Sequence, residues 1–399
     1  MCEREQRGLA IAARNRIKRK DGKWQVPSQS GKGKYTVSSD QSTCSCPDHE
    51  SRGVVCKHIF AVQFTIEREY SEDGSLTETV TLKTVRKTYT QNWRAYNAAQ
   101  TNEKDKFQVL LRDLCQGIRE PKAGRGRPRI PLNDAVFSAV FKVYSTVSGR
   151  RFMSDLRDSQ AKGYIGRTPS YNSIFNVLES ERTTSVLQML VVESANPLTT
   201  IETNFACDSS GFSGSRFDRW FDHKWGELQI KRAWVKAHIM CGVKTNVITA
   251  VEIHDQHAAD SPLLPAMLNS TAERFSINEV SADMGYLAES NLKAVVDAGG
   301  TPLIPFKSNS APTRPGLWNK MFHYFSFNRD EFLSRYHQRS NVESTFSMLK
   351  AKFGDGVRSK TDIAMKNEVL AKIVCHNICC LISATYELEI DPVFWGSAA

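Results

Sequence analysis

The stretch Tyr336-His-Gln-Arg339-Ser-Asn-Val-Glu343-Ser-Thr-Phe-Ser-Met-Leu-Lys350 combines a carboxylate, a phenol and two cations. On a helix, successive residues turn by about 100°, so these four side chains fall within roughly 60° of one another. A narrow polar stripe of this kind either forms surface ion pairs or holds reactive groups together. The stretch therefore predicts a helix that presents Glu343 between positive groups.

A second, apolar stripe lies beside the first at core spacing: Val342, Phe346, Leu349 and Phe353. Gly354 follows as a stop signal for the helix. One alternative reading is equally specific. Ser340-Asn-Val-Glu343 fits a capping box, in which Glu343 would bond a backbone amide at the helix start.

Length and charge bound the class of protein. The chain has 399 residues, enough for two or three domains, and 40% of them are hydrophobic, which suffices for a sizeable core. A net charge of +10 favours a polyanionic partner such as nucleic acid, although ribosomal and membrane-surface proteins are equally basic. We expect no signal peptide and no membrane span. The predicted location is the cytoplasm, with the nucleoid in a prokaryote or the nucleus in a eukaryote.

Metal-binding side chains gather in Cys44-Ser-Cys46-Pro-Asp-His-Glu-Ser-Arg-Gly-Val-Val-Cys56-Lys-His58. The Cys-x-Cys and Cys-x-His pairs supply three thiolates and one imidazole, which is a full tetrahedral set for structural zinc. Free thiols are the alternative. Disulfides are not expected, because cysteines of a cytosolic protein usually bind metal or are buried. His49 competes as a ligand, and the paired spacing favours His58.

This pattern resembles the SWIM zinc finger, and the resemblance covers residues 34–66. It implies one structural Zn²⁺ and the binding of DNA or protein, without saying which. A closed four-ligand site has no open position for catalysis, so we expect no chemistry there. The preceding residues, 1–33, are predicted to form a basic arm.

Residues 67–130 are predicted to be a linker that ends in a basic stretch. Arg125-Gly-Arg127-Pro-Arg129 follows a run rich in proline and glycine, which is typical of extended chain. It resembles the core of an AT-hook, and this resemblance implies insertion of Arg125 and Arg127 into narrow A·T minor grooves. A plain basic linker is the alternative.

Residues 131–200 are predicted to be a helical DNA-binding segment. Apolar helical patterns cover residues 133–147, 170–179 and 184–194, and Thr168-Pro169 is a helix-start signal. Basic side chains cluster between these helices: Arg150, Arg151, Arg157, Lys162 and Arg167. The pattern fits a DNA reader of the helix-turn-helix type, and a plain helical bundle explains it as well.

From residue 203 onward, short strands alternate with helices. Strands are predicted over 204–207, 233–241, 247–253, 278–282 and 301–307, with the second and third forming a hairpin. Helices are predicted over 260–274, 287–298 and 361–386, besides the one that carries Glu343. This order indicates an α/β fold, a mixed sheet flanked by helices.

Two aspartates stand just past strands of the predicted sheet. Asp208 and Asp283 follow the first and fourth strands, where open α/β sheets commonly bind ligands. Together with Glu343 they are the candidate catalytic acids, and Asp255 is the reserve for the second position.

Residues 203–355 resemble the DDE domain of cut-and-paste insertion-sequence transposases, which implies a ribonuclease H-like fold for residues 201–390. One large group of these enzymes carries Tyr, two residues, Arg, three residues, Glu, six residues, Lys. The opening stretch matches all four positions and all three gaps. Asp208 matches the first aspartate and Asp283, in Ala-Asp-Met-Gly-Tyr, matches the second. The interval before Glu343 is too short for the large extra domain that some members insert there.

The resemblance implies a site for two Mg²⁺, for which Mn²⁺ can substitute. Asp208 would bridge the ions, and Asp283 and Glu343 would complete one ion each. Arg339 and Lys350 would hold phosphates, and Tyr336 would bond a phosphate or stack near the cleaved end. Weaker candidates for DNA contact are Lys231, Arg232, Lys307, Trp220 and Trp225.

These expectations combine into a DNA transposase that cuts at element ends and transfers the freed 3′-OH into target DNA. Double-stranded DNA is the expected partner, a homodimer is expected from the family, and no membrane is involved. One rival is a non-enzymatic DNA-binding regulator on a domesticated scaffold. Another is a ribonuclease H-like nuclease that cuts without strand transfer.

Overall fold

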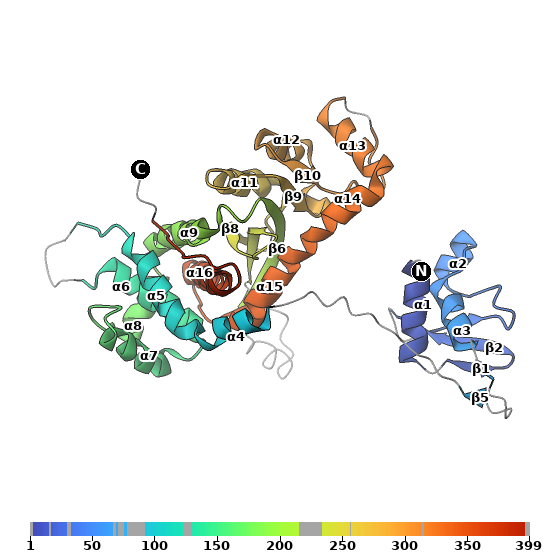
Figure 1. The fold of residues 1–399 in the computed structure, drawn as a ribbon, viewed down its shortest axis with the longest axis horizontal. Coiled ribbons are helices and arrows are strands. Elements are labelled where there is room, and N and C mark those ends of the chain that lie inside the picture. Colours follow the sequence, from blue (N-terminus) through green and yellow to red (C-terminus); the bar gives the residue numbers. More distant parts are fainter. Residues whose placement is uncertain are drawn as a thin grey trace. The chain divides into compact units, whose positions relative to one another are not determined.

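The computed structural model describes residues 3–15, 17–29, 33–66, 69–70, 76–77, 92–122, 129–214, 234–255, 257–312 and 315–395. The chain divides into two compact units, residues 1–90 and residues 91–399 (Figure 1). Six residues singled out in the sequence lie outside the described residues: Arg125, Arg127, Trp220, Trp225, Lys231 and Arg232.

The first unit packs helices on a three-stranded antiparallel sheet of order β1-β2-β3. Its elements are α1 (Glu3–Arg14), β1 (Lys18–Lys20), β2 (Lys23–Pro27), β3 (Lys34–Val37), α2 (Pro47–Arg52), α3 (Lys57–Ile66), β4 (Glu69–Tyr70) and β5 (Leu76–Thr77). Helix α1 packs on α3, and Gly8 allows the close approach, because a Cβ there would lie 2.8 Å from the Lys57 carbonyl oxygen.

The basic arm predicted for residues 1–33 is wrong for the described part of that range. Ile11 of α1 and the alternating residues Trp24 and Val26 of β2 are buried in one core with Val37. The cations of β1 stay exposed, so the segment is both basic and folded. Single apolar residues supply this packing. They are spaced between charged residues, so the sequence shows no apolar run that would indicate a core.

The second unit begins with helices. They are α4 (Trp93–Thr101), α5 (Glu103–Gln116), α6 (Leu132–Ser145), α7 (Gly149–Ala161), α8 (Tyr171–Leu178), α9 (Glu181–Ala195) and the 3₁₀ turn η1 (Asn196–Leu198). Part of the predicted linker is therefore helical, with Phe107 and Leu111 of α5 fully buried. The helix expected to start at Thr168-Pro169 starts later, since Ser170 is the residue that caps the Ser173 amide.

The sheet of the second unit has the order β10-β9-β6-β7-β8. Its elements are β6 (Asn204–Gly214), β7 (Trp234–Gly242), β8 (Ile248–Asp255), η2 (Ser261–Leu263), α11 (Leu264–Ala272), β9 (Glu279–Ala282), η3 (Met284–Tyr286), α12 (Glu289–Asp297) and β10 (Thr301–Leu303). Strands β6, β7 and β8 are antiparallel, whereas β9 and β10 run parallel to β6. The predicted hairpin and mixed α/β sheet are confirmed.

The remaining elements are α13 (Leu317–Phe327), α14 (Arg329–Tyr336), η4 (His337–Arg339), α15 (Ser340–Phe353), β11 (Gly356–Val357) and α16 (Asp362–Glu387). The short strand β11 belongs to the sheet, since it pairs in parallel with the end of β6. Helices α15 and α16 lie on one face, and α11 and α12 lie on the other (Figure 1). Helices α13 and α14 were not predicted from the sequence. Their aromatic side chains, including Phe325 and Phe332, pack on one another at ring distances near 5.1 Å.

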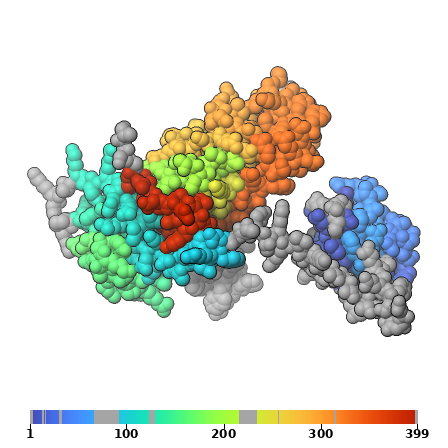
Figure 2. Space-filling model, viewed as in Figure 1, coloured from blue at the N-terminus to red at the C-terminus, as the bar shows by residue number. Residues whose placement is uncertain are grey.

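Helix α16 joins the helical segment to the sheet. It contacts α4, α5, α6 and α9, and the red C-terminal part of the chain lies against the cyan and green helices (Figure 2). By length and composition α16 could cross a membrane, but 78% of its apolar window is buried inside the protein, as in the core helix of a soluble protein. Residues 131–200 and the sheet therefore share one core.

Candidate functional site

The two predicted aspartates are brought side by side by strand pairing. Strands β6 and β9 are parallel, and Cys207 of β6 lies opposite Ala282 of β9. The residues that follow this pair are Asp208 and Asp283. Strand β6 continues to Gly214, so Asp208 lies within the strand and not at its end as predicted. On this edge of β6, β9 pairs up to Cys207 and β11 pairs from Ser213, which places Asp208 just beyond β9.

Arg339 links the first and third predicted acids. Its Nη2 donates to Asp208 Oδ2 at 2.9 Å, and its Nη1 donates to Glu343 Oε1 at 2.7 Å. Asp208 and Arg339 are largely buried, whereas the Glu343 side chain is 60% exposed. The third nitrogen, Arg339 Nε, is buried and has no partner among the described residues. The guanidinium thus joins β6 to the start of α15.

The acids repel one another electrostatically. Burial raises the pKa of Asp208, and the charges of Asp283 and Glu343 act in the same direction, against a backbone hydrogen bond and Arg339. Burial also raises the pKa of Tyr336, and the charges of the same three carboxylates raise it further. Tyr336 is therefore a protonated hydrogen-bond donor beside the acids. Such a cluster has more negative charge than its one guanidinium offsets.

Asp283 caps the turn that follows β9. Its Oδ1 accepts from the Gly285 amide at 2.8 Å, which leaves the other carboxylate oxygen for a ligand. The reserve candidate, Asp255, is not brought to the site. It ends β8, and β7 separates β8 from β6 in the sheet.

Lys350 forms a second link between α15 and β6. Its Nζ donates to Ser210 Oγ at 2.6 Å and lies 5.2 Å from the centre of the Phe212 ring. Burial lowers the pKa of Lys350, and Asp355 opposes that effect. Ser210 was not predicted from the sequence. Alternation along β6 was the available signal, because residues two apart in a strand share a face, here with Asp208.

The predicted single helix over 336–350 is broken at its beginning. Helix α14 ends at Tyr336, the turn η4 follows, and α15 begins at Ser340. The spacing of Arg339 and Glu343 survives the break as a direct ion pair. The capping-box alternative is wrong, since α15 has no side-chain cap and Glu343 bonds the Arg339 guanidinium.

The donor set suits a hard divalent cation, since Mg²⁺ prefers carboxylate oxygens. Among the described residues, however, the group whose ligand atoms lie within 4.8 Å of one another is at the other end of the chain. The guanidinium of Arg339 bonds Asp208 and Glu343 and so offsets part of their negative charge, as a bound cation would. In this arrangement the three carboxylates do not form such a close group, because Arg339 bonds two of them.

That close group is the predicted zinc set. Cys44, Cys46, Cys56 and His58 are all buried, and His58 Nε2 has no hydrogen-bond partner among the described residues. A hydrogen bond with Cys44 lowers the pKa of Cys56 to about 3, so one thiolate is favoured there. His49 is not part of the group, because its Nδ1 contacts the Val54 carbonyl oxygen at 2.8 Å.

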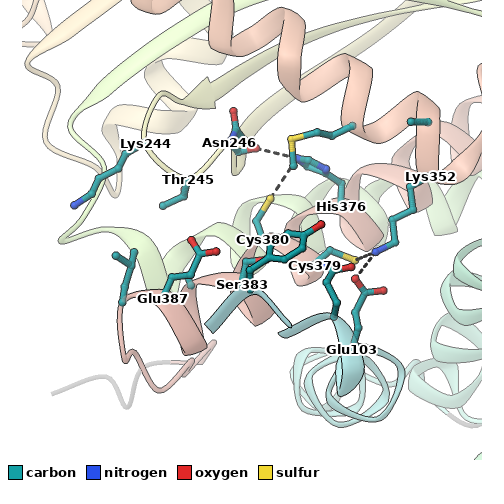
Figure 3. A pocket seen from close by; sticks show the side chains of 16 residues that line it. Glu103, Lys244, Thr245, Asn246, Lys352, His376, Cys379, Cys380, Ser383 and Glu387 are labelled. Carbon is teal, nitrogen blue, oxygen red and sulfur yellow. Dashed lines mark hydrogen bonds and ion pairs between the residues drawn. The ribbon is translucent and has the colours of Figure 1, made fainter. Parts of the chain in front are cut away.

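A separate cavity of about 810 Å³ lies between α4, α15, α16 and the β7–β8 turn (Figure 3). Its wall includes His376, whose Nε2 lies 2.9 Å from the Asn246 carbonyl oxygen, and the thiol of Cys379, which accepts from Lys352 Nζ at 3.3 Å. None of the three acids lines it. The cavity is therefore distinct from the carboxylate cluster.

The fold and the two clusters together define a two-unit protein with a zinc-type site and an acidic site on a mixed sheet. Comparison with family models identifies two parts of the chain. Residues 200–378 match the transposase DDE domain, and residues 34–63 match the SWIM zinc finger. The chain therefore carries a transposase DDE domain behind a SWIM zinc finger. A search of curated proteins found no match.

Proposed function

We propose that this protein is a DNA transposase that cleaves element ends and joins the freed 3′-OH to target DNA. The observation that carries the proposal is the convergence of Asp208, Asp283 and Glu343 in a domain of the transposase DDE family. The strand order β10-β9-β6-β7-β8, with three antiparallel and two parallel strands, supports a ribonuclease H-like fold for that domain.

Both chemical steps are in-line displacements at phosphorus. In the first, a water oxygen attacks a backbone phosphate, the P–O3′ bond breaks, and the 3′ oxygen leaves and takes a proton. In the second, that 3′-OH attacks a target phosphate, loses its proton, and displaces the target 3′ oxygen. Two Mg²⁺ held by Asp208, Asp283 and Glu343 would activate the attacking oxygen and stabilise the leaving one.

The surrounding cations would position the DNA. Arg339 offers a planar fork and a buried Nε that has no partner among the residues the structure describes, which suits a phosphate. Lys350 would supply a point charge, and protonated Tyr336 would donate to a phosphate oxygen. Exposed Lys307, which follows β10, is a further candidate for backbone contact. The proposed partner is double-stranded DNA, bound by a homodimer because two ends must be processed.

The helical segment, the basic stretch and the zinc finger would bind DNA or protein and take no part in the chemical steps. Helices α6 to α9 would contact DNA through their exposed cations, and the zinc finger would bind DNA or protein. The stretch with Arg125 and Arg127 would contact the minor groove. The regulator and the nuclease without strand transfer remain the alternatives that an experiment must separate.

Cleavage of a plasmid that carries this gene with its native flanks tests the proposal. Wild type and Glu343→Gln would be compared in Mg²⁺, Mn²⁺ and Ca²⁺, and every new 3′ end would be mapped. We expect discrete wild-type cuts at paired flanking repeats and none with the variant. Intact DNA binding by both proteins without cuts would favour the regulator.

A further inference from the structure

A cavity of about 450 Å³ lies where the start of α7, the end of α6 and the loop before α16 meet. Val143, Leu178 and Ala364 contribute apolar wall, and the cations Lys142, Arg358 and Lys360 also line it. We call this cavity the α6–α7 pocket. It belongs to the helical part of the second unit and shares no lining residue with the carboxylate cluster.

Lys142 is a buried cation that has no partner in the described part of the chain. Its side chain lines the pocket, only 8% of the residue is exposed, and its ammonium has no hydrogen bond or ion pair among the described residues. Burial lowers the pKa of Lys142, and Glu368 opposes that effect. An unpaired buried charge is costly, so an anion that enters the pocket would be stabilised by pairing with Lys142.

The nearest carboxylate is already engaged. Glu368 accepts from the backbone amides of Arg358 and Ser359 at 2.8–3.0 Å. Lys372, which is also near Glu368, donates to two backbone carbonyl oxygens. Glu179 is the other acid of the pocket, and it is exposed. The cations at the pocket therefore exceed the acids that could neutralise them.

The start of α7 adds open donors to the same pocket. Ser148 is the N-cap residue, and its hydroxyl makes no capping bond, so first-turn amides are left for another acceptor. Gly149 lets this helix start approach Phe175, because a Cβ would lie 2.7 Å from its ring. Arg358 is held at the mouth by a 3.4 Å hydrogen bond from its Nη1 to the Val147 carbonyl oxygen.

We propose that the α6–α7 pocket binds one phosphate group of a DNA backbone, with Lys142, Arg358 and the first-turn amides of α7 as its donors. The inference rests on the proposed DNA-binding function and assigns part of it to a defined site. A DNA strand is favoured over a small anion because Arg150 and Arg151 continue the exposed basic surface along α7. A free phosphate ion would not need that extension.

The salt dependence of DNA binding tests this site in the full-length protein without divalent metal. Fluorescence anisotropy of a labelled duplex would give the slope of log Kd against log [NaCl]. Removing one phosphate contact should lower the magnitude of that slope by about 0.9. We expect this fall for Lys142→Met, and a fall for Arg358→Gln at the exposed mouth. Lys106→Met, an exposed lysine of α5, is the control of equal charge and should keep the wild-type slope.

The outcomes separate the two levels of the proposal. If the wild type does not bind the duplex, the DNA-binding function itself fails. If it binds and the slopes of Lys142→Met and Arg358→Gln match the wild type, the pocket proposal alone is overturned. An equal fall for Lys106→Met would assign the effect to net charge and overturn it too.

Thermal unfolding in inorganic phosphate, compared with chloride at equal ionic strength, distinguishes the source of the anion. Phosphate could raise the melting temperature of the wild type but not of Lys142→Met, while the salt dependence of DNA binding stays the same for both. That result would identify a small anion, and not DNA, as the ligand of the pocket. Unfolding also controls for a structural role, because replacing an unpaired buried cation with methionine should not lower the melting temperature.

Discussion

Arg339 is the residue that links the carboxylates of the acidic site. It bonds Asp208 and Glu343 with two nitrogens of one planar group, while Nε has no partner among the described residues. A lysine has the same charge but cannot span two carboxylates in a fixed plane. The guanidinium therefore orients the two acids as well as balancing them.

We expect Arg339→Lys to lower DNA cleavage by about 10- to 100-fold, because small displacements of reacting groups are that costly. Single-turnover cleavage of the plasmid substrate measures the effect. Arg329→Lys is the matched control, since Arg329 is an exposed residue whose guanidinium lies over the Phe325 ring. Equal rates for Arg339→Lys and wild type would show that the fork has no role.

His376 makes the stability of the second unit depend on pH. Burial lowers its pKa to about 4, although the hydrogen bond to Asn246 opposes the shift. The folded protein therefore favours neutral His376, and its contribution is complete above the unfolded pKa of about 6.5. That contribution is lost as the pH falls from about 6.5 to about 4.

Between these pH values the free energy of unfolding of the wild type should fall by an amount on the order of 3 kcal/mol more than that of His376→Gln. Urea unfolding at a series of pH values measures it. His337→Gln, an exposed histidine, should leave the profile unchanged. A profile for His376→Gln that runs parallel to the wild type would contradict the buried neutral histidine.

The acidic site was partly predictable at this scale. The spacing of Arg339 and Glu343 survived because a four-residue interval keeps two side chains on one face of a helix even when the turn before it tightens. The ion pair with Asp208 could not be read from spacing, since it joins residues far apart in the chain. Partners such as Ser210 likewise depend on how α15 crosses β6.

Among the elements, α16 holds the helices and the sheet together through Asn377. This fully buried amide accepts from the Ile248 amide at 2.8 Å and donates to the Ile248 carbonyl oxygen at 2.7 Å. It also donates to Ser194 Oγ at 2.9 Å. One side chain therefore ties α16 to both β8 and α9.

We expect Asn377→Ala to destabilise the second unit by about 2–4 kcal/mol, because buried backbone groups would lose their partners. The free energy of unfolding in urea checks this. Asn172→Ala, at an exposed position of α8, should change it by less than about 0.5 kcal/mol. Similar small changes for both variants would mean that water replaces the amide.

The break before α15 shows why element boundaries were less predictable. Residues 336–350 have a continuous helical pattern, yet contacts with the sheet turn the chain at η4. Arg335 bonds Glu279 of β9 at 2.8 Å, and Gln338 accepts from Asn204 of β6 at 3.4 Å. Such tertiary contacts override local preference, and the sequence does not show them.

For the whole molecule, the division into two units predicts that zinc binding and the proposed catalysis are separable. Cys56→Ser removes a ligand, so we expect the protein to lose its zinc. The melting temperature of the first unit should fall, and that of the second unit should not change. Zinc content and calorimetry measure this, and metal-dependent hydrolysis should persist. Cys379→Ser, in the second unit, should retain zinc. Loss of hydrolysis in a still-folded Cys56→Ser protein would contradict the separation.

The most direct test of the central claim is whether this protein forms a new DNA junction. Wild type and Asp208→Asn would be incubated in Mg²⁺ with labelled flanking DNA and an unlabelled target plasmid. Sequencing would then identify any junctions. We predict that the wild type joins the element's 3′ ends to target 5′ phosphates, and that Asp208→Asn binds the DNA without joining it. Cleaved ends without junctions would contradict strand transfer and identify a nuclease.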